Sequence, residues 1–229
     1  MRVGWLLCLI GFGCGSGALP EVTRTAGEIQ DGAEDRVRKA RTVQVRFSAA
    51  SSDGATSLTG RLAIDGEDKA FLLLEGSLAG RPFTLTRICD GKTARTACSL
   101  FPGPSTVPAP PKIREDFLDQ WLGSGILGLL PKLSVETPGE GPKKPTDPLS
   151  GLSRERGPNE VVDGRERVSV QYLLDGMPTL TRWYDRLSGL PVQRDMRMPK
   201  SLKPDWTESY LNVRLDEAIE PAAFTVPKD

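Results

Sequence analysis

The side chains that most often carry out chemistry are few in this sequence. Its 229 residues include no histidine, which excludes Ser-His-Asp and Cys-His catalysis and any metal site built on imidazole. Carboxylates do cluster, at Glu115-Asp116 with Asp119 and at Asp163 with Glu166. A chain with 30 acidic residues contains such pairs on its solvated surface without any acid-base role. We therefore predict a protein that is not an enzyme and that uses no metal and no cofactor.

The N-terminus has the pattern of an export signal. Residues 3–12 form an apolar run behind a single positive charge, and such a run is too short to cross a bilayer, which takes about 20 helical residues. We predict a signal peptide over residues 1–18 and a protein that is periplasmic or anchored to the membrane as a lipoprotein. Three outcomes stay open: lipidation of Cys14, cleavage after Ala18, or retention as an anchor.

Two further cysteines, Cys89 and Cys98, lie in the body of the chain. An oxidising compartment favours a disulfide between them. A hairpin turn at Asp90-Gly91-Lys92, however, places Cys89 opposite a residue near Ala94 and leaves Cys98 out of bridging range. A disulfide and two separate thiols therefore both remain open, and the spacing is not that of a CxxC redox or metal motif.

Composition narrows the class of protein further. The 30 basic residues equal the 30 acidic ones, and the pI is near 6.4, so nothing indicates nucleic-acid binding. A hydrophobic content of 38% supports a globular core, while 24 Gly and 19 Pro favour short strands and turns over a helical bundle.

Hydrophobic periodicity predicts the elements that must position the apolar side chains. Residues 28–40 repeat apolar positions every four residues and predict a helix. After residue 43 the period becomes two, which predicts antiparallel strands joined by tight turns. A last helical turn near the C-terminus is expected to anchor Phe224. The predicted strands cover residues 43–49, 58–64, 70–75, 82–89, 92–100, 166–174, 179–185, 190–198 and 205–213.

A helical insert interrupts these strands. Residues 102–112 hold five prolines and predict an extended connector, and a second loop rich in Pro, Gly and Lys spans 137–148. We predict a helical cover, residues 113–133, inside a single domain covering 19–229. Residues 126–130 are either an exposed patch for membrane or lipoprotein contact or a turn that caps the core. The fold class is α+β: a curved antiparallel sheet, or incomplete barrel, with an N-terminal helix and the helical cover.

Several short motifs lie in these elements. They are Gly60-Arg61-Leu62-Ala63-Ile64, Ile88-Cys89-Asp90-Gly91-Lys92-Thr93, Trp183-Tyr184-Asp185, Ser188-Gly189-Leu190-Pro191 and Glu220-Pro221-Ala222-Ala223-Phe224. Together they resemble the periplasmic lipoprotein-carrier (LolA/LolB-like) superfamily, in one of its poorly characterised branches. The resemblance covers most of residues 28–227. It implies an incomplete antiparallel barrel whose helices cover an apolar cavity that holds acyl chains.

The resemblance also implies which residues line that cavity. Acyl chains gain about 0.8 kcal/mol per buried CH₂, so an apolar sheet face and an apolar cover can hold them without a catalytic group. In the carriers, an Arg before a Pro, in the turn after the Gly-x-Leu strand, contacts the cover; Gly66 and Glu67 stand there in this chain, so that contact is not expected. The candidate lining residues are Val45, Phe47, Leu62, Ile64, Leu73, Phe83, Leu85, Val170 and Tyr172 on strands, with Trp121, Leu122, Leu129 and Leu130 on the cover.

Two functions follow. The first is an exported binding protein that holds a lipid, a lipoprotein acyl chain or another apolar ligand. The alternative is an envelope sensor or structural module that binds a protein partner and touches the membrane only through its N-terminal anchor or a surface patch. A continuous cavity on the inner face favours the first, and a solidly packed interior with an exposed edge or patch favours the second.

Overall fold

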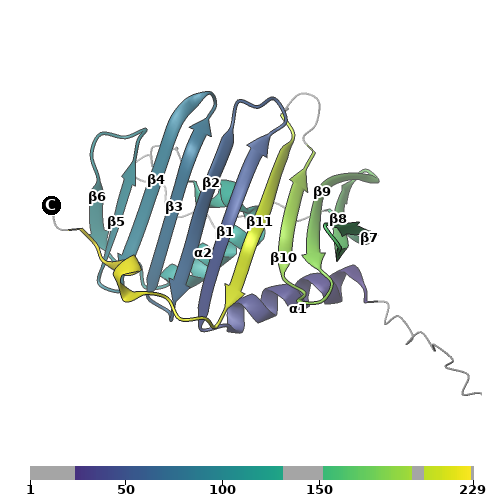
Figure 1. The fold of residues 1–229 in the computed structure, drawn as a ribbon, viewed down its shortest axis with the longest axis horizontal. Coiled ribbons are helices and arrows are strands. Elements are labelled where there is room, and N and C mark those ends of the chain that lie inside the picture. The colour runs from purple at the N-terminus through teal and green to yellow at the C-terminus, as the bar shows by residue number, and fades with distance from the viewer. Residues whose placement is uncertain (1–23, 131–151, 198–203, 228–229) are drawn as a thin grey trace, which may run out of the picture.

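The computed structural model describes residues 24–130, 152–197 and 204–227. At its centre is one sheet of eleven antiparallel strands, in the order β6-β5-β4-β3-β2-β1-β11-β10-β9-β8-β7, which is not closed into a barrel (Figure 1). This α+β curved sheet confirms the predicted fold class. The predicted signal with Cys14 and the predicted loop at 137–148 lie outside the described residues.

Consecutive strands pair antiparallel within each half of the chain, from β1 to β6 and from β7 to β11. Their bounds are β1 Thr42–Ser51, β2 Ser57–Asp65, β3 Lys69–Leu78, β4 Arg81–Asp90, β5 Thr93–Cys98, β6 Ser105–Pro108, β7 Ser153–Val162, β8 Arg165–Leu174, β9 Met177–Asp185, β10 Pro191–Met196 and β11 Trp206–Leu215. The last strand, β11, returns to pair with the first, β1, with Val45 opposite Val213. This pairing joins the two halves of the chain into one sheet.

Two of these strands were not predicted. The proline-rich connector contains the four-residue edge strand β6, and β7 forms the opposite edge. Both are largely exposed, so neither shows the alternation of apolar and polar residues by which a half-buried strand is recognised. Hydrophobic periodicity therefore does not predict edge strands of this kind.

Helix α1, Ala26–Lys39, begins at a capping box. The Oγ1 of Thr25 accepts a hydrogen bond from the backbone N–H of Glu28 at 3.2 Å, and the Glu28 carboxylate accepts one from the backbone N–H of Thr25 at 2.7 Å. These bonds satisfy two of the free N–H groups at the start of a helix. The predicted apolar stripe of Ile29, Ala33 and Val37 is buried.

The sheet has an inner face, which carries α1, α2 (Ile113–Ser124) and α3 (Ile126–Leu129), and an outer face, which is turned to the viewer in Figure 1. On the outer face, the 3₁₀ turn η2 (Pro221–Phe224) buries Phe224 against Ala63 and Phe71, as the predicted anchor requires. The main core lies between the inner face and the α2–α3 segment.

The two described cysteines are free thiols, so the disulfide alternative is wrong. Cys89 lies opposite Ala94, whereas Cys98 lies opposite Leu85. The two thiols are thus separated by four residues along β4, or about 13 Å. A disulfide requires Cα atoms within about 7 Å.

Candidate functional site

Most of the predicted cavity residues meet on the inner face, beneath α2 and α3. Each is buried or half-buried in one apolar cluster, which contains Val45, Phe47, Leu62, Ile64, Phe83, Leu85, Trp121, Leu122 and Leu129, with Leu130 at its margin. The side chains of the cover fill the space between cover and sheet. In this closed arrangement the interior is a packed core.

Three predicted lining residues lie elsewhere. Leu73 packs with the outer-face cluster around Phe71, because its neighbours Leu72 and Leu74 take the inner face; the prediction for Leu73 was wrong because an uninterrupted apolar run does not show which alternate residues face inward. Val170 and Tyr172 belong to a second cluster that α1 covers. The apolar interior therefore consists of two parts, under different helices.

The segment α2–α3, which we call the cover, is docked by apolar side chains on both sides of its break. Ile126 and Leu129 are completely buried and Leu127 is exposed, so residues 126–129 cap the core. The alternative of an exposed contact patch at this point is wrong. Phe117 and Trp121, on α2, are among the largest fully buried side chains of the described chain.

Three charged side chains lie under the cover in a single row across the sheet. Arg182 of β9 is the register partner of Arg194 of β10, which in turn is the register partner of Glu208 of β11. All three are buried. We call this row the clasp, because each member holds the backbone of the cover.

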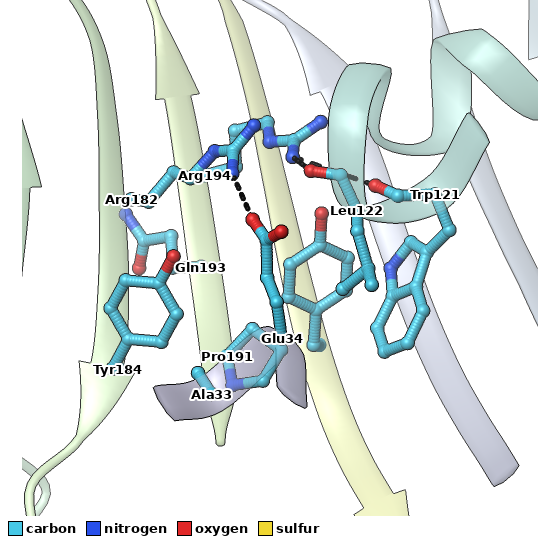
Figure 2. Close-up of a pocket in the computed structure, with 10 residues that line it drawn as sticks. Ala33, Glu34, Trp121, Leu122, Arg182, Tyr184, Pro191, Gln193 and Arg194 are labelled. Carbon is cyan, nitrogen blue, oxygen red and sulfur yellow. Dashed lines mark hydrogen bonds and ion pairs between the residues drawn. The ribbon is translucent and has the colours of Figure 1, made fainter. Parts of the chain in front are cut away.

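The two arginines hold the C-terminal end of α2. Arg194 donates a hydrogen bond to the backbone carbonyl of Leu122 at 2.8 Å, and Arg182 donates to that of Gly123 at 2.9 Å. Carbonyls in the last turn of a helix have no partner within the helix and carry its negative dipole end. Buried cations at this position donate hydrogen bonds to the free carbonyls and interact favourably with the negative end of the helix dipole. Arg182 also pairs with Glu34 of α1 at 3.1 Å (Figure 2).

Glu208 holds the start of α3. Its Oε1 accepts hydrogen bonds from the backbone N–H of Ile126 and from Nε1 of Trp206, both at 2.9 Å. Its Oε2 accepts one from the hydroxyl of Tyr210 at 2.7 Å. A buried carboxylate with three donors is well compensated for its loss of hydration.

Glycine at position 125 makes this approach possible. Gly125 joins the two helices with φ +71° and ψ −152°, a conformation that is essentially restricted to glycine. A Cβ atom there would lie 2.2 Å from Oε2 of Glu208 and 2.3 Å from Nη1 of Arg194. Both charged groups therefore lie against the Gly125 backbone.

A cavity of about 20 Å³ lies beside the clasp, between α1, α2 and strands β9 to β11 (Figure 2). It is large enough for about one water molecule and far too small for an acyl chain. Among the described residues, Nε of Arg182 and both Nε and Nη1 of Arg194 are buried without a hydrogen-bond partner. Burial raises the pKa of Tyr184, in the cavity wall, to about 12. The wall of this cavity thus carries buried polar groups, some of them unsatisfied, unlike the apolar core beside it.

The N-terminal end of the cover is held separately. Arg114 of α2 is buried and donates to the carbonyls of Arg38 at 3.0 Å and Gly66 at 3.0 Å, as well as to those of Ala40 and Arg41. The turn at Gly66, where the sequence led us to expect no contact with the cover, thus has a polar contact with it, and the donor lies on the cover.

Sequence reasoning missed the clasp. The signal that could have found it is a charged residue at an inward position of a strand, as Glu208 is between Trp206 and Tyr210, or Arg182 between Leu180 and Tyr184. Within the described ranges no cluster of His, Cys, Asp or Glu could hold a metal ion. Nor is any helix there long and apolar enough to span a membrane. The geometry is that of a packed apolar interior under a helical segment whose backbone is held by buried charged side chains.

Comparison with known proteins supports the fold. No protein-family model matches the chain, and no curated protein matches it. Among solved structures, an uncharacterized conserved protein from Thermus thermophilus matches with a TM-score of 0.51 and 9% identity, over 89% of this chain and 95% of that one. An identity this low shows a shared fold and says nothing about a ligand.

Two further matches have lower TM-scores. A LolA superfamily protein from Nitrosomonas europaea matches with a TM-score of 0.31 and 10% identity, over 89% of this chain and 99% of that one. The MucA/MucB complex of Pseudomonas aeruginosa matches with 0.48 and 13%, over 88% of this chain and 61% of that one.

Proposed function

We propose that this protein is an exported, non-enzymatic binding protein that takes up an apolar ligand, such as the acyl chain of a lipid or lipoprotein, between the inner sheet face and the cover. One observation carries the proposal: the cover is a separate helical segment on an almost wholly apolar sheet face, fastened at its break by buried side-chain hydrogen bonds. In the closed form its side chains occupy the place of the ligand.

Uptake then exchanges one apolar contact for another. An acyl chain of twelve carbons gains about 9 kcal/mol on burial, at about 0.8 kcal/mol per CH₂. A cover that shifts outward can keep its apolar side chains on the bound chain, so the hydrophobic cost of opening is largely recovered. The hydrogen bonds of the clasp break when the cover moves and the ligand does not replace them, so their free energy determines how readily the cover opens.

The test is uptake of a defined acyl probe. The purified protein, carrying Cys14→Ser so that it brings no acyl chain of its own, is examined by native mass spectrometry and then titrated with a dibrominated C18 fatty acid. We expect one bound chain and quenching of Trp121 fluorescence by the bromines, with most of the quenching lost in Trp121→Phe. Absence of co-purified lipid together with absence of probe uptake would overturn the proposal.

Variants of the clasp sharpen the test. Glu208→Gln keeps the shape of the side chain but removes its charge, and it should speed probe uptake by loosening the cover. Arg38→Gln is the matched control, because it removes the exposed ion pair between Arg38 and Asp119 on α2, and such pairs contribute about 0–1 kcal/mol. Equal uptake rates in both variants would show that the clasp does not control ligand entry.

The alternative function, binding of a protein partner, is favoured by the packed interior. With a cavity of about 20 Å³ beside the clasp, the closed protein offers a partner its outer surface rather than a ready pocket. A probe that fails to enter even the clasp variants would leave this second function as the better one.

A further inference from the structure

A second hollow, of about 700 Å³, lies at the other end of β10 and β11. β10 pairs with β11 only from Gln193 opposite Ser209 to Met196 opposite Trp206. On its other side β11 stays paired with β1 as far as Leu215. In the described part of the chain, residues 210–215 of β11 thus have a neighbouring strand on one side only.

Two bulges produce this split. The register between β11 and β1 shifts at Leu211, which has no partner on β1, and the register between β10 and β9 shifts between Pro191 and Gln193. A bulge bends its strand and increases the local twist. Because both bulges lie just beyond the last β10–β11 pair, the strands draw apart toward the end of the sheet at which α1 lies (Figure 1).

The free edge of β11 differs from the outer edges of the sheet. Edge strands are normally protected from pairing with other chains by prolines, bulges or charges. β6 ends at Pro108, and β7 has a register shift around Gly157-Pro158 within a charged sequence. Residues 210–215 include the bulge at Leu211, but they contain no proline and only one charged residue, and Leu211 is 69% exposed. Pro191, across the groove on β10, has no N–H to offer a strand.

We infer that this groove binds an extended peptide segment of a partner protein, which adds as a strand along residues 210–215 of β11. The unpaired peptide groups of a strand edge are complementary to another peptide strand and not to an acyl chain. Six residues of strand extend about 20 Å. The groove walls add side-chain selection, since Leu187 (97% exposed), Leu190 and Leu211 line it together with the Arg186–Glu166 ion pair.

The bound segment therefore places apolar side chains at alternate positions, toward these leucines. This inference stands apart from acyl-chain uptake: the groove is built by β10, β11 and the turns beside them, and no residue of the cover lines it. The groove is a binding site for the alternative function, the binding of a protein partner. Failure of the peptide test leaves lipid uptake unaffected, and the converse also holds.

The experiment uses the full chain with Cys14→Ser. Displayed random octapeptides are selected on this protein with counter-selection on Leu211→Lys, which places a charge at the free edge without touching the core. One selected octapeptide is synthesised in two forms, unmodified and N-methylated at alternate amides. Met177→Lys, at another exposed apolar residue (70% exposed) at the start of β9, is the matched control.

We expect the unmodified peptide to bind wild type and Met177→Lys equally and Leu211→Lys at least about tenfold more weakly. N-methylation should weaken binding by a similar factor, since it removes backbone hydrogen bonds worth about 0.5–1.5 kcal/mol each. Amide hydrogen exchange in residues 210–215 should slow when the peptide binds, and this readout does not depend on any variant folding correctly.

Three results would overturn the inference. They are failure to enrich any peptide, unchanged exchange at residues 210–215 with a bound peptide, and equal binding of the N-methylated form. A dimer in analytical ultracentrifugation that Leu211→Lys dissociates would also overturn it, because a second copy of this chain would then occupy the edge.

Discussion

Replacing Glu208 by leucine should lower the free energy of unfolding by about 4 kcal/mol, because each buried donor that loses its acceptor costs about 1–3 kcal/mol. The change leaves three donors without an acceptor: the Ile126 N–H, Nε1 of Trp206 and the Tyr210 hydroxyl. It also leaves the buried guanidinium of Arg194 without the carboxylate that lies against the same glycine. Leucine fills most of the vacated volume, so little of the loss comes from a cavity.

The variant Glu208→Gln removes the charge of the side chain and keeps its shape, so it measures the effect of the charge alone. In Glu208→Gln the amide oxygen still accepts the bonds from Ile126 and Trp206, and the hydroxyl of Tyr210 turns to accept from the new NH₂ group. Hydrogen bonds to charged groups are worth about 1 kcal/mol more than those between neutral groups, so we expect a loss of about 2 kcal/mol. Urea unfolding followed by tryptophan fluorescence measures the loss of stability in both Glu208 variants, and an unchanged m-value checks that unfolding stays two-state.

A double-mutant cycle tests whether the clasp acts as a unit. Arg194→Met alone should cost about 1–3 kcal/mol, because it leaves the buried carbonyl of Leu122 without its donor. The combination with Glu208→Leu should cost less than the sum of the two by about 2 kcal/mol, because each single variant leaves the other charge buried without its neighbour. Strict additivity would mean that the two charges do not interact. A Glu208→Leu protein within about 1 kcal/mol of wild type would refute the argument that this carboxylate fastens the cover.

Three further predictions follow from the same structure. Gly125→Ala should destabilise the protein by about 2–3 kcal/mol, because the backbone conformation there suits only glycine and the added Cβ atom would clash with the clasp. Gly123→Ala should instead stabilise the protein by about 0.5–1 kcal/mol, because Gly123 is a helical position with free space around it. Urea unfolding measures the free energy of both variants. Since the pKa of buried Tyr184 is raised to about 12, the unfolded chain releases this proton first. Tyr184 should therefore contribute a fall in stability of about 1.4 kcal/mol per pH unit between pH 10 and 12, in addition to Tyr172 and Tyr210, whose pKa values burial also raises. A Tyr184→Phe protein with the same slope as wild type would contradict this. Both thiols, Cys89 and Cys98, should react with a thiol reagent only on unfolding, without prior reduction, and an unreactive unfolded protein would instead indicate a bridge.

Local pattern was enough to predict much of the fold. The capped helix at α1, nine of the strands and the anchoring of Phe224 follow from the spacing of apolar residues and from turn residues close in sequence. The sequence left a disulfide and two free thiols open, and the hairpin register at the Asp90-Gly91 turn decides for free thiols. Leu73 and the edge strand β7 were mispredicted or missed because neither an unbroken apolar run nor an exposed charged strand shows alternation.

The site depended on pairings between distant segments. Arg182, Arg194 and Glu208 form a row because the registers of the consecutive strands β9, β10 and β11 place them side by side, but the backbone groups that they bind belong to the cover, which is far away in the sequence. The bulge at Leu211 likewise lies in the pairing of β11 with β1, at the other end of the described chain. For the strands whose apolar and polar residues alternate, the sequence by itself thus determined which residues turn inward, through the two-residue period of a strand. Only the tertiary structure decided which of them meet the cover, because alternation is a local property and the docking of a distant helix is not.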